Sequence, residues 1–520
     1  SNITLSTEGI YGIPLGVSAS IVYLFVCFGS LLDKAGAGRF FTNLALSVLG
    51  RFKGGAAKAA VVASGATGIV SGSSIANIVT TGPFTIPLMK KTGYPAKKAA
   101  AIEVASSTDG QLMPPIMGAA AFIIAEYVNV PYLEVVKAAA IPAFASYFGL
   151  FCITHLEASK LGIEGLPPEE LPNFWETLKN GLHYLIPLGM LLYQLVWLRH
   201  SPELAAYRSI QLLVMVVFYQ EIRKAYLEKK PETEATGMGA SLMGSVVTEG
   251  LKRSVMLILN GLIQGSKNMM SVALACASAG IIVGVVNMGI GGMISGWVES
   301  LSQGNIFLLL LITAAASLLI GMGLPTTATY IVMASLTAPI IVEVGGIYGF
   351  IIPIMAAHLF CFYFGILADD TPPVGLAAYA ASAIAESEPI PTGIQGFLYD
   401  IRTSCIAFLF VFNPELILHN INNWPQALLI FAMCLVGMSA FECFAQGWGL
   451  VRNKWYDLPF FLAAWFTLFH PGGVASFFHV DLSHKYYFFF LGLFVYAVVL
   501  FIQSMRKRRA ESALTHGVST

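Results

Sequence analysis

Charged side chains are scarce in this sequence. Only 11% of the 520 residues are Asp, Glu, Lys or Arg, whereas a soluble domain carries roughly 25%. This scarcity excludes an ordinary soluble protein. The 29 basic and 29 acidic residues also cancel, so the chain lacks the positive excess that nucleic-acid binding requires.

Motifs of metal-dependent and redox enzymes are missing as well. The seven cysteines form no C-x-x-C pair, and no H-E-x-x-H string occurs. Tyr399-Asp400 matches one half of the aspartyl intramembrane protease pattern, but the G-x-G-D partner string is absent. We therefore expect no enzymatic activity.

Hydrophobic residues make up 56% of the chain, which predicts an all-α polytopic membrane protein. Residues 13–32 are long and apolar enough for a first spanning helix. Residues 39–50 alternate apolar and polar faces, which predicts an amphipathic helix lying along the membrane interface.

A run of 31 uncharged residues, 59–89, follows between Lys58 and Lys90. It is too long for one crossing, which needs about 20 residues. Glycines and serines crowd into its centre, which predicts a break there. Basic residues lie at both ends and indicate that both face the cytoplasm. The run therefore predicts a re-entrant hairpin with the SGSS string (71–74) at its tip.

The next apolar segment, 96–130, is interrupted by STDGQLMPP at 107–115. A pair of prolines beside a glycine predicts a discontinuous membrane helix. Further expected elements are a crossing at 132–157, an aqueous loop at 160–181, crossings at 182–199 and 204–222, a charged linker at 221–236, an amphipathic helix at 243–265 and a crossing at 269–288.

The opening pattern then returns. Residues 300–342 are 43 uncharged residues, flanked by Glu299 and Glu343, with GMGLPTTATY (321–330) at their centre. A long apolar segment, 347–368, is followed by ADDTPPVG (368–375). The two Pro-Pro pairs lie 258 positions apart. Two hairpins, each followed by a broken helix, predict an inverted repeat, the pattern of secondary transporters. The absence of basic residues at the second hairpin predicts that it enters from the opposite leaflet.

Apolar segments at 395–413, 425–442, 458–470 and 486–505 complete the chain, and we expect the last three to be peripheral. The predicted division is a scaffold helix with a first interfacial arm (1–55), the first transport repeat (56–158), scaffold helices with a linker and a second interfacial arm (159–298), the second transport repeat (299–413) and additional C-terminal membrane helices (414–520).

Three acids, Asp109, Asp369 and Asp370, lie just before the Pro-Pro pairs. They are either caps of half-helices or functional groups, and charges inside membranes favour function. Such carboxylates can complete sodium sites or carry protons, so the coupling ion is Na+ or H+. The helix N-termini at the breaks suit an anionic substrate. His358 is more typical of a packed structural residue.

The sequence resembles the large membrane subunit of tripartite ATP-independent periplasmic (TRAP) transporters. The matching strings are LLDKAGAGRFF (31–41), GIVSGSSIAN (68–77), IPLMKKTGYP (86–95), TDGQLMPP (108–115) and TPPVGL (371–376). GQLMPPIMGAAAF (110–122) and the added C-terminal helices resemble most the fused-permease branch that works with a binding protein of the TAXI type.

The resemblance implies an elevator mechanism in the bacterial inner membrane. It also implies a periplasmic binding protein and a small four-helix membrane subunit, upstream in the same polypeptide or on a separate chain. The first coupling-ion site would comprise Ser71, Gly72, Ser73, Ser74, Asn77, Thr108, Asp109 and Gly110. The second would comprise Gly321, Gly323, Thr326, Thr327, Asp369, Asp370 and Thr371. The substrate site would comprise Ser73, Ser74, Asn77, Pro114, Pro115, Thr326, Thr327, Pro372 and Pro373. The commoner family pattern has apolar residues at Asp109, Asp369 and Asp370, which makes protons a candidate for coupling.

The predicted function is ion-coupled import of a small organic anion, such as a carboxylate, with no cofactor and no metal apart from Na+. The alternative is a stand-alone sodium- or proton-coupled carboxylate symporter that needs no binding protein.

Overall fold

The computed structural model describes residues 7, 9–236, 239–421 and 423–517. This part of the chain folds into helices, with one isolated β-bridge between Trp448 and Arg452. The first half contains α2 (Ile13–Val17), α3 (Tyr23–Ala35), α4 (Ala37–Leu49), α5 (Gly55–Ser71), α6 (Ser74–Lys91), α7 (Ala96–Asp109), α8 (Gly118–Val128), α9 (Tyr132–Leu161), α10 (Phe174–Leu192) and α11 (Pro202–Thr236). The second half contains α12 (Gly239–Val285), α13 (Gly291–Ser302), α14 (Ile306–Gly321), α15 (Thr326–Leu336), α16 (Ala338–Ile347), α17 (Ile354–Leu367), α18 (Leu376–Ala385), α19 (Pro389–Phe412), α20 (Trp424–Ala445), α21 (Asp457–Phe469), α22 (Pro471–Phe477) and α23 (Tyr487–Gly517).

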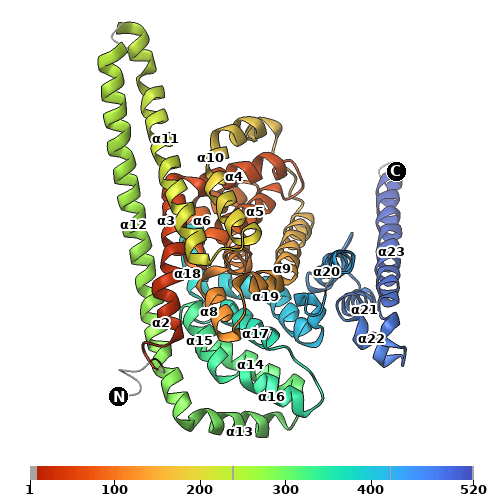
Figure 1. The fold of residues 1–520 in the computed structure, drawn as a ribbon. Helices are drawn as coiled ribbons and strands as arrows, with labels where there is room; N and C mark the ends of the chain where they lie inside the picture. The colour runs from red at the N-terminus through yellow and green to blue at the C-terminus, as the bar shows by residue number, and fades with distance from the viewer. Residues whose placement is uncertain (1–6, 8, 237–238, 422, 518–520) are drawn as a thin grey trace.

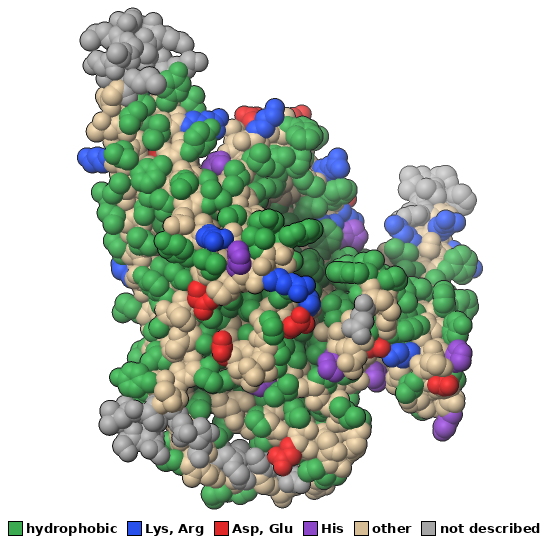
Figure 2. Space-filling view, viewed as in Figure 1, with side chains coloured by type: hydrophobic (Ala, Val, Ile, Leu, Met, Phe, Trp, Pro, Cys, Tyr) green, Lys and Arg blue, Asp and Glu red, His purple; other side chains and the backbone are tan. Residues whose placement is uncertain are grey.

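Long apolar helices confirm the prediction of a polytopic membrane protein. Among the described residues, seven helices are long and apolar enough to cross a bilayer. The bent pair α21–α22, with 105° between its helices, makes an eighth if it is counted as one span. Hydrophobic side chains cover much of the outer surface (Figure 2), including exposed Leu, Met and Phe residues of α12 and α23. Such a surface suits lipid rather than water.

The chain breaks in the first half fall within the predicted strings. Gly72, between α5 and α6, has a φ of 62°, which a residue without a Cβ adopts freely. The Ser73 side chain then caps α6 by accepting a hydrogen bond from the Ala76 backbone N–H. The helix after this hairpin is interrupted between α7 and α8, and the Pro114–Pro115 bond in this break is cis.

The second half has the same kinds of break. Helix α14 ends at Gly321, and α15 begins at Thr326 directly after Pro325. Helix α17 ends at Leu367, and α18 begins at Leu376, with a cis Pro372–Pro373 bond between them. The segment after the tip is itself divided into α15 and α16 at Thr337, which the sequence pattern did not predict.

The two halves pack into each other. Helix α18 packs against α6 and α7 of the first half, whereas α8 packs against α15 and α17 of the second. In Figure 1, α4 and α5 lie toward the upper end of the molecule, and α13, α14 and α16 occupy the lower end. The helices that begin the two predicted hairpins, α5 and α14, thus lie toward opposite ends of the molecule (Figure 1), and entry from opposite leaflets stays a prediction.

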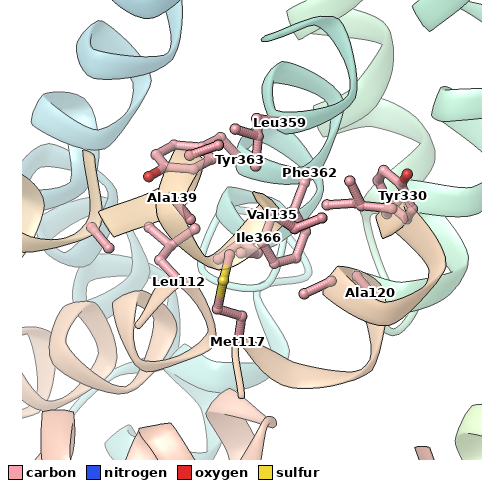
Figure 3. Close-up of a cluster of buried hydrophobic side chains, with 14 of the residues drawn as sticks. Leu112, Met117, Ala120, Val135, Ala139, Tyr330, Leu359, Phe362, Tyr363 and Ile366 are labelled. Atoms are coloured by element: carbon pink, nitrogen blue, oxygen red, sulfur yellow. The ribbon is translucent and has the colours of Figure 1, made fainter. Parts of the chain in front are cut away.

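The core lies between the breaks. Leu112 and Met117, from the first break, meet Val135 and Ala139 of α9. Figure 3 shows Leu359, Phe362 and Ile366 of α17 pointing into the same cluster. These side chains are fully buried, or nearly so. Their packing fixes the first break against the helix that leads into the second.

Three sequence predictions for the middle of the chain are wrong. The expected linker, 221–236, is the end of helix α11. The expected interfacial arm, 243–265, is not a separate helix but part of one helix of 47 residues, α12. The crossing predicted at 269–288 lies mainly in this same helix and is confirmed, because residues 244–285 are long and apolar enough to span a bilayer. The expected loop, 160–181, already contains the start of α10 at Phe174. Helices α11 and α12 instead form a long antiparallel pair along one side (Figure 1). Residues 1–6 and 8 of the range 1–55 and the side chain of Glu299 lie outside the described part.

Candidate functional site

The Asp369 carboxylate joins both hairpin tips and both breaks. Its Oδ2 atom accepts hydrogen bonds from Ser74 Oγ (2.8 Å) and Thr326 Oγ1 (3.0 Å), the residues that open α6 and α15. Gln111 Nε2, from the first break, lies 3.3 Å from the same atom. Asp369 is 8% exposed, so these three donors replace the water that a free carboxylate would bind. We call Asp369, Ser74, Gln111 and Thr326 the junction.

Small residues let the hairpins reach the breaks. A Cβ on Gly68 of α5 would lie 2.6 Å from the Gly110 Cα atom, and a Cβ on Gly72 would lie 2.9 Å from Gly118 Cα. In the second half, a Cβ on Gly321 would lie 2.4 Å from Ala368 Cβ. Contacts this short leave no room for a side chain. Glycine at these positions is therefore a condition for the junction to form.

Asp109 lies in a separate cluster centred on a buried arginine. Arg402 Nη2, from α19, donates to Asp109 Oδ2. Asp109 also accepts hydrogen bonds from Ser146 Oγ (2.8 Å) and Thr403 Oγ1 (3.2 Å). Arg402 Nε donates to the Ser146 carbonyl at 2.9 Å. Asp109 and Arg402 are fully buried as an ion pair whose other hydrogen-bonding groups are largely occupied.

Three further acids belong to the same cluster: Asp400 and Glu442 approach the arginine, and Asp370 lies beside Asp400. Asp400 Oδ1 lies 2.9 Å from Arg402 Nη1, and the Asp370 carboxyl is a direct neighbour of Asp400. Glu442 reaches the cluster from α20, where its Oε1 atom and the Arg402 Cδ atom both approach Gly149. We call Arg402, Asp109, Asp370, Asp400 and Glu442 the Arg402 cluster. No group of three or more His, Cys, Asp or Glu residues in the described part of the chain is arranged to hold a metal ion.

The matching family model carries the description "Tripartite ATP-independent periplasmic transporter, DctM component" and covers residues 7–424. The chain belongs to this family. It is similar to the 2,3-diketo-L-gulonate TRAP transporter large permease protein YiaN of Escherichia coli K12, with 23% identity over 76% of this chain and 84% of that protein. It is also similar to the C4-dicarboxylate TRAP transporter large permease protein DctM of Pseudomonas aeruginosa, with 24% identity over 69% of this chain and 76% of that protein. The ectoine TRAP transporter large permease protein TeaC of Halomonas elongata shares 24% identity over 32% of this chain and 38% of that protein.

The family match and the membrane-spanning helices show that this chain is a multi-pass TRAP transporter large permease. A location in the bacterial inner membrane is consistent with both findings. Large permeases of this family work with a periplasmic binding protein and a small membrane subunit. The family model describes a transporter component rather than an enzyme.

The structure separates the predicted site residues of the permease. It brings Ser74, Thr326 and Asp369 together at the junction, whereas Asp109 and Asp370 belong to the Arg402 cluster. Asn77 turns into the first hairpin, where its Nδ2 atom donates to the Ser64 carbonyl (2.9 Å).

The remaining predicted residues line the tips and breaks. The Thr371 hydroxyl donates to the Leu367 carbonyl of its own helix (2.6 Å), and the Ser71 hydroxyl donates to the Ser73 carbonyl (3.3 Å). Thr327 is nearly buried beside the second tip, and Gly323 has a φ of 81° within it. Thr108 Oγ1 is buried without a hydrogen-bond partner among the described residues. The four prolines Pro114, Pro115, Pro372 and Pro373 shape the two breaks.

Sequence reasoning missed Gln111, although a signal was present. Gln111 stands three residues before Pro114, as Asp369 stands three residues before Pro372. The pairing of the two Pro-Pro strings therefore places Gln111, and not Asp109, opposite Asp369. These two equivalent residues approach each other in the structure.

Sequence reasoning also missed Arg402 and Glu442. Each is a charge within an otherwise apolar segment, which is itself a signal for function. The expectation that the C-terminal helices are peripheral is wrong for α20, because α20 packs on α9 and brings Glu442 to Arg402. His358 Nδ1 lies 2.9 Å from the Tyr330 hydroxyl, in a buried contact away from the junction.

Proposed function

We propose that this permease imports a small organic anion, a carboxylate, by coupling its movement to that of Na+ or H+. The observation that carries the proposal is the junction: one buried carboxylate is bonded to both hairpin tips and faces the first break. A cation or proton that binds at Asp369 acts on all these elements at once. Binding of the coupling ion can thus bias the position of the whole unit.

Substrate recognition follows from the same geometry. Helices α6 and α15 begin at the tips, and helix N-termini carry partial positive charge that favours anions. The Ser73 and Thr327 hydroxyls stand at these ends and can add hydrogen-bond donors, whereas the hydroxyls of Ser74 and Thr326 donate to Asp369. Two of the similar permeases are named for diketo-gulonate and C4-dicarboxylate, both carboxylates.

We further propose an elevator mechanism, in which the hairpins and broken helices move as one unit against a scaffold that contains α3, α11 and α12. The interlocked packing of α18 on α6 and α7, and of α8 on α15 and α17, supports movement as a unit. The long α11–α12 pair packs against α3 at one side, where a fixed support would stand (Figure 1).

The partner would be a periplasmic binding protein of the TAXI type, acting with a small four-helix membrane subunit. The alternative is a stand-alone carboxylate symporter. An uptake measurement distinguishes this symporter from the transporter that needs a binding protein, because both would use the same junction.

The test is uptake by proteoliposomes that contain the permease and its small subunit. Radiolabelled C4-dicarboxylates and keto sugar acids are supplied with and without the binding protein, under sodium and pH gradients imposed separately. We expect accumulation only with the binding protein and with one of the gradients. Accumulation without the binding protein would establish the stand-alone symporter, and accumulation without any gradient would refute ion coupling.

A further inference from the structure

Four carboxyl groups share one cation in the Arg402 cluster. Asp109, Asp370, Asp400 and Arg402 are 0 to 1% exposed, and Glu442 is 1% exposed. With every acid ionised, the cluster would carry four negative charges and one positive charge. Uncompensated charge is very costly in such a buried site. Some of the carboxyl groups must therefore be neutralised by another partner.

The hydrogen bonds are unevenly distributed among these acids. Asp109 receives donors from Arg402, Ser146 and Thr403. Asp400 lies beside Arg402 Nη1 at 2.9 Å. Neither oxygen of Asp370 accepts a hydrogen bond from any described residue. Asp370 also forms no ion pair with Arg402, so its negative charge is less compensated than the charges of Asp109 and Asp400.

The neighbours of Asp370 are themselves acidic. Asp400 of α19 is its direct neighbour, and Asp369 and Asp109 (α7) also face it. Glu442 of α20 and the Tyr147 hydroxyl of α9 face Asp400 and Asp109. Arg402 is the cation on these elements that reaches the group, and its guanidinium is engaged by Asp109 and Asp400. Two adjacent buried carboxylates cannot both keep their charge, and they commonly share one proton.

We propose that Asp370 and Asp400 share a proton that resides on Asp370, and that this pair is a proton-exchange site separate from the junction. The Asp370 hydroxyl donates to Asp400, and Asp400 keeps its charge opposite Arg402. One proton thus gives Asp370 and Asp400 a shared hydrogen bond, in addition to the ion pair that Asp400 forms with Arg402. This proposal rests on the proposed function and deepens it. In a permease that imports an organic anion, the proton at Asp370 would move together with that anion.

Partly exposed residues lie beside Asp370. A narrow crevice is lined by Asp370 together with Pro372, Pro373, Tyr379 and Ile390. Tyr379 is 45% exposed and Ile390 is 50% exposed, whereas Asp370 is 0% exposed. The crevice has no room for a water molecule in this conformation. Exchange therefore requires the break before α18 to shift, which ties the proton to a conformational change.

Infrared spectroscopy of the purified permease tests the proton directly, without a substrate. We expect a carbonyl band of a protonated carboxylic acid that disappears in Asp370→Asn. It should persist in Asp481→Asn, a control in an exposed loop. An unchanged band in Asp370→Asn, or loss of carboxylate absorption instead, would overturn the proposal.

Thermal unfolding gives a second readout. An Asn at position 370 can still donate to Asp400, so Asp370→Asn should unfold at the wild-type temperature. Asp400→Asn removes the charge opposite Arg402 and should lower the unfolding temperature. Equal losses in both variants would contradict an asymmetric, proton-sharing pair.

The proposed function and the proposed proton site can be refuted independently of each other. If no anion is taken up in the uptake assay, but the band depends on Asp370, the proposed function fails and the proton site remains. If uptake is driven by sodium alone and the band does not depend on Asp370, the proton site fails and the transporter remains.

Discussion

Replacing Arg402 should destabilise the permease more than replacing any surface charge. The Arg402 side chain is 0% exposed and contacts Asp109 and Asp400, both also 0% exposed. Arg402→Met leaves these acids buried without their cation. Removing one partner of a buried ion pair costs about 3–5 kcal/mol. Exchanging an arginine for a similarly long apolar side chain keeps cavity formation small, so the stranded charge dominates the loss.

A combined variant separates charge from packing. In Arg402→Met with Asp109→Asn and Asp400→Asn, no stranded charge remains at these positions. We expect it to recover most of the loss, because replacing a whole buried pair is often nearly neutral. Lys137→Met is the control. Lys137 pairs with Glu134 at 2.7 Å, but both side chains are about half exposed, so its loss should stay below about 1 kcal/mol.

The assay is unfolding of the purified protein in detergent, followed by tryptophan fluorescence as denaturant increases. The reasoning would be refuted if Arg402→Met were as stable as Lys137→Met. It would also be refuted if the combined variant were no more stable than Arg402→Met.

Two further predictions concern the junction. Gly68→Ala should lower both stability and uptake, because its Cβ would lie 2.6 Å from Gly110 Cα. Gly189→Ala is the control: a Cβ at Gly189 has open space around it, so this variant should behave as wild type in the same unfolding and uptake assays. Ser74→Ala and Thr326→Ala each remove a donor to Asp369 Oδ2, which costs about 1.5–3 kcal/mol for a hydrogen bond to a charged group. The two donors share one acceptor atom, so their effects on the free energy of unfolding should be coupled. In a double-mutant cycle, the loss in the double variant should differ from the sum of the two single losses by at least about 0.5 kcal/mol. Strict additivity would argue against a shared site.

The chain breaks were predictable because local chemistry causes them. Gly72 and the two Pro-Pro pairs lie at breaks between helices, whereas Gly65 and Gly68 lie within α5. Local chemistry also explains why the prediction of a linker at 221–236 is wrong. Its Glu and Lys residues are charged, but they favour helix as its Ala and Leu residues do, so charge alone does not end α11.

The partners of the buried charges could not be predicted in this way. Arg402 and Asp109 lie 293 positions apart, and nothing in the strings around them pairs one with the other. Asp109, Asp369 and Asp370 look alike in the sequence, since each precedes a Pro-Pro pair. The packing of α19 against α7 and α9 gives Asp109 its cation. The meeting of the two hairpin tips with the first break gives Asp369 hydroxyl and amide donors instead.

Substrate accumulation by Asp369→Asn tests the central claim most directly. In proteoliposomes of the complete transporter, gradient-driven accumulation is compared with exchange of substrate across the membrane when no gradient is applied. Asn keeps the shape of Asp369 but not its charge. We predict that accumulation is lost while exchange continues, because the hairpins still meet but no longer respond to the ion. Accumulation by Asp369→Asn at the wild-type rate, under the same sodium and pH gradients, would contradict the account.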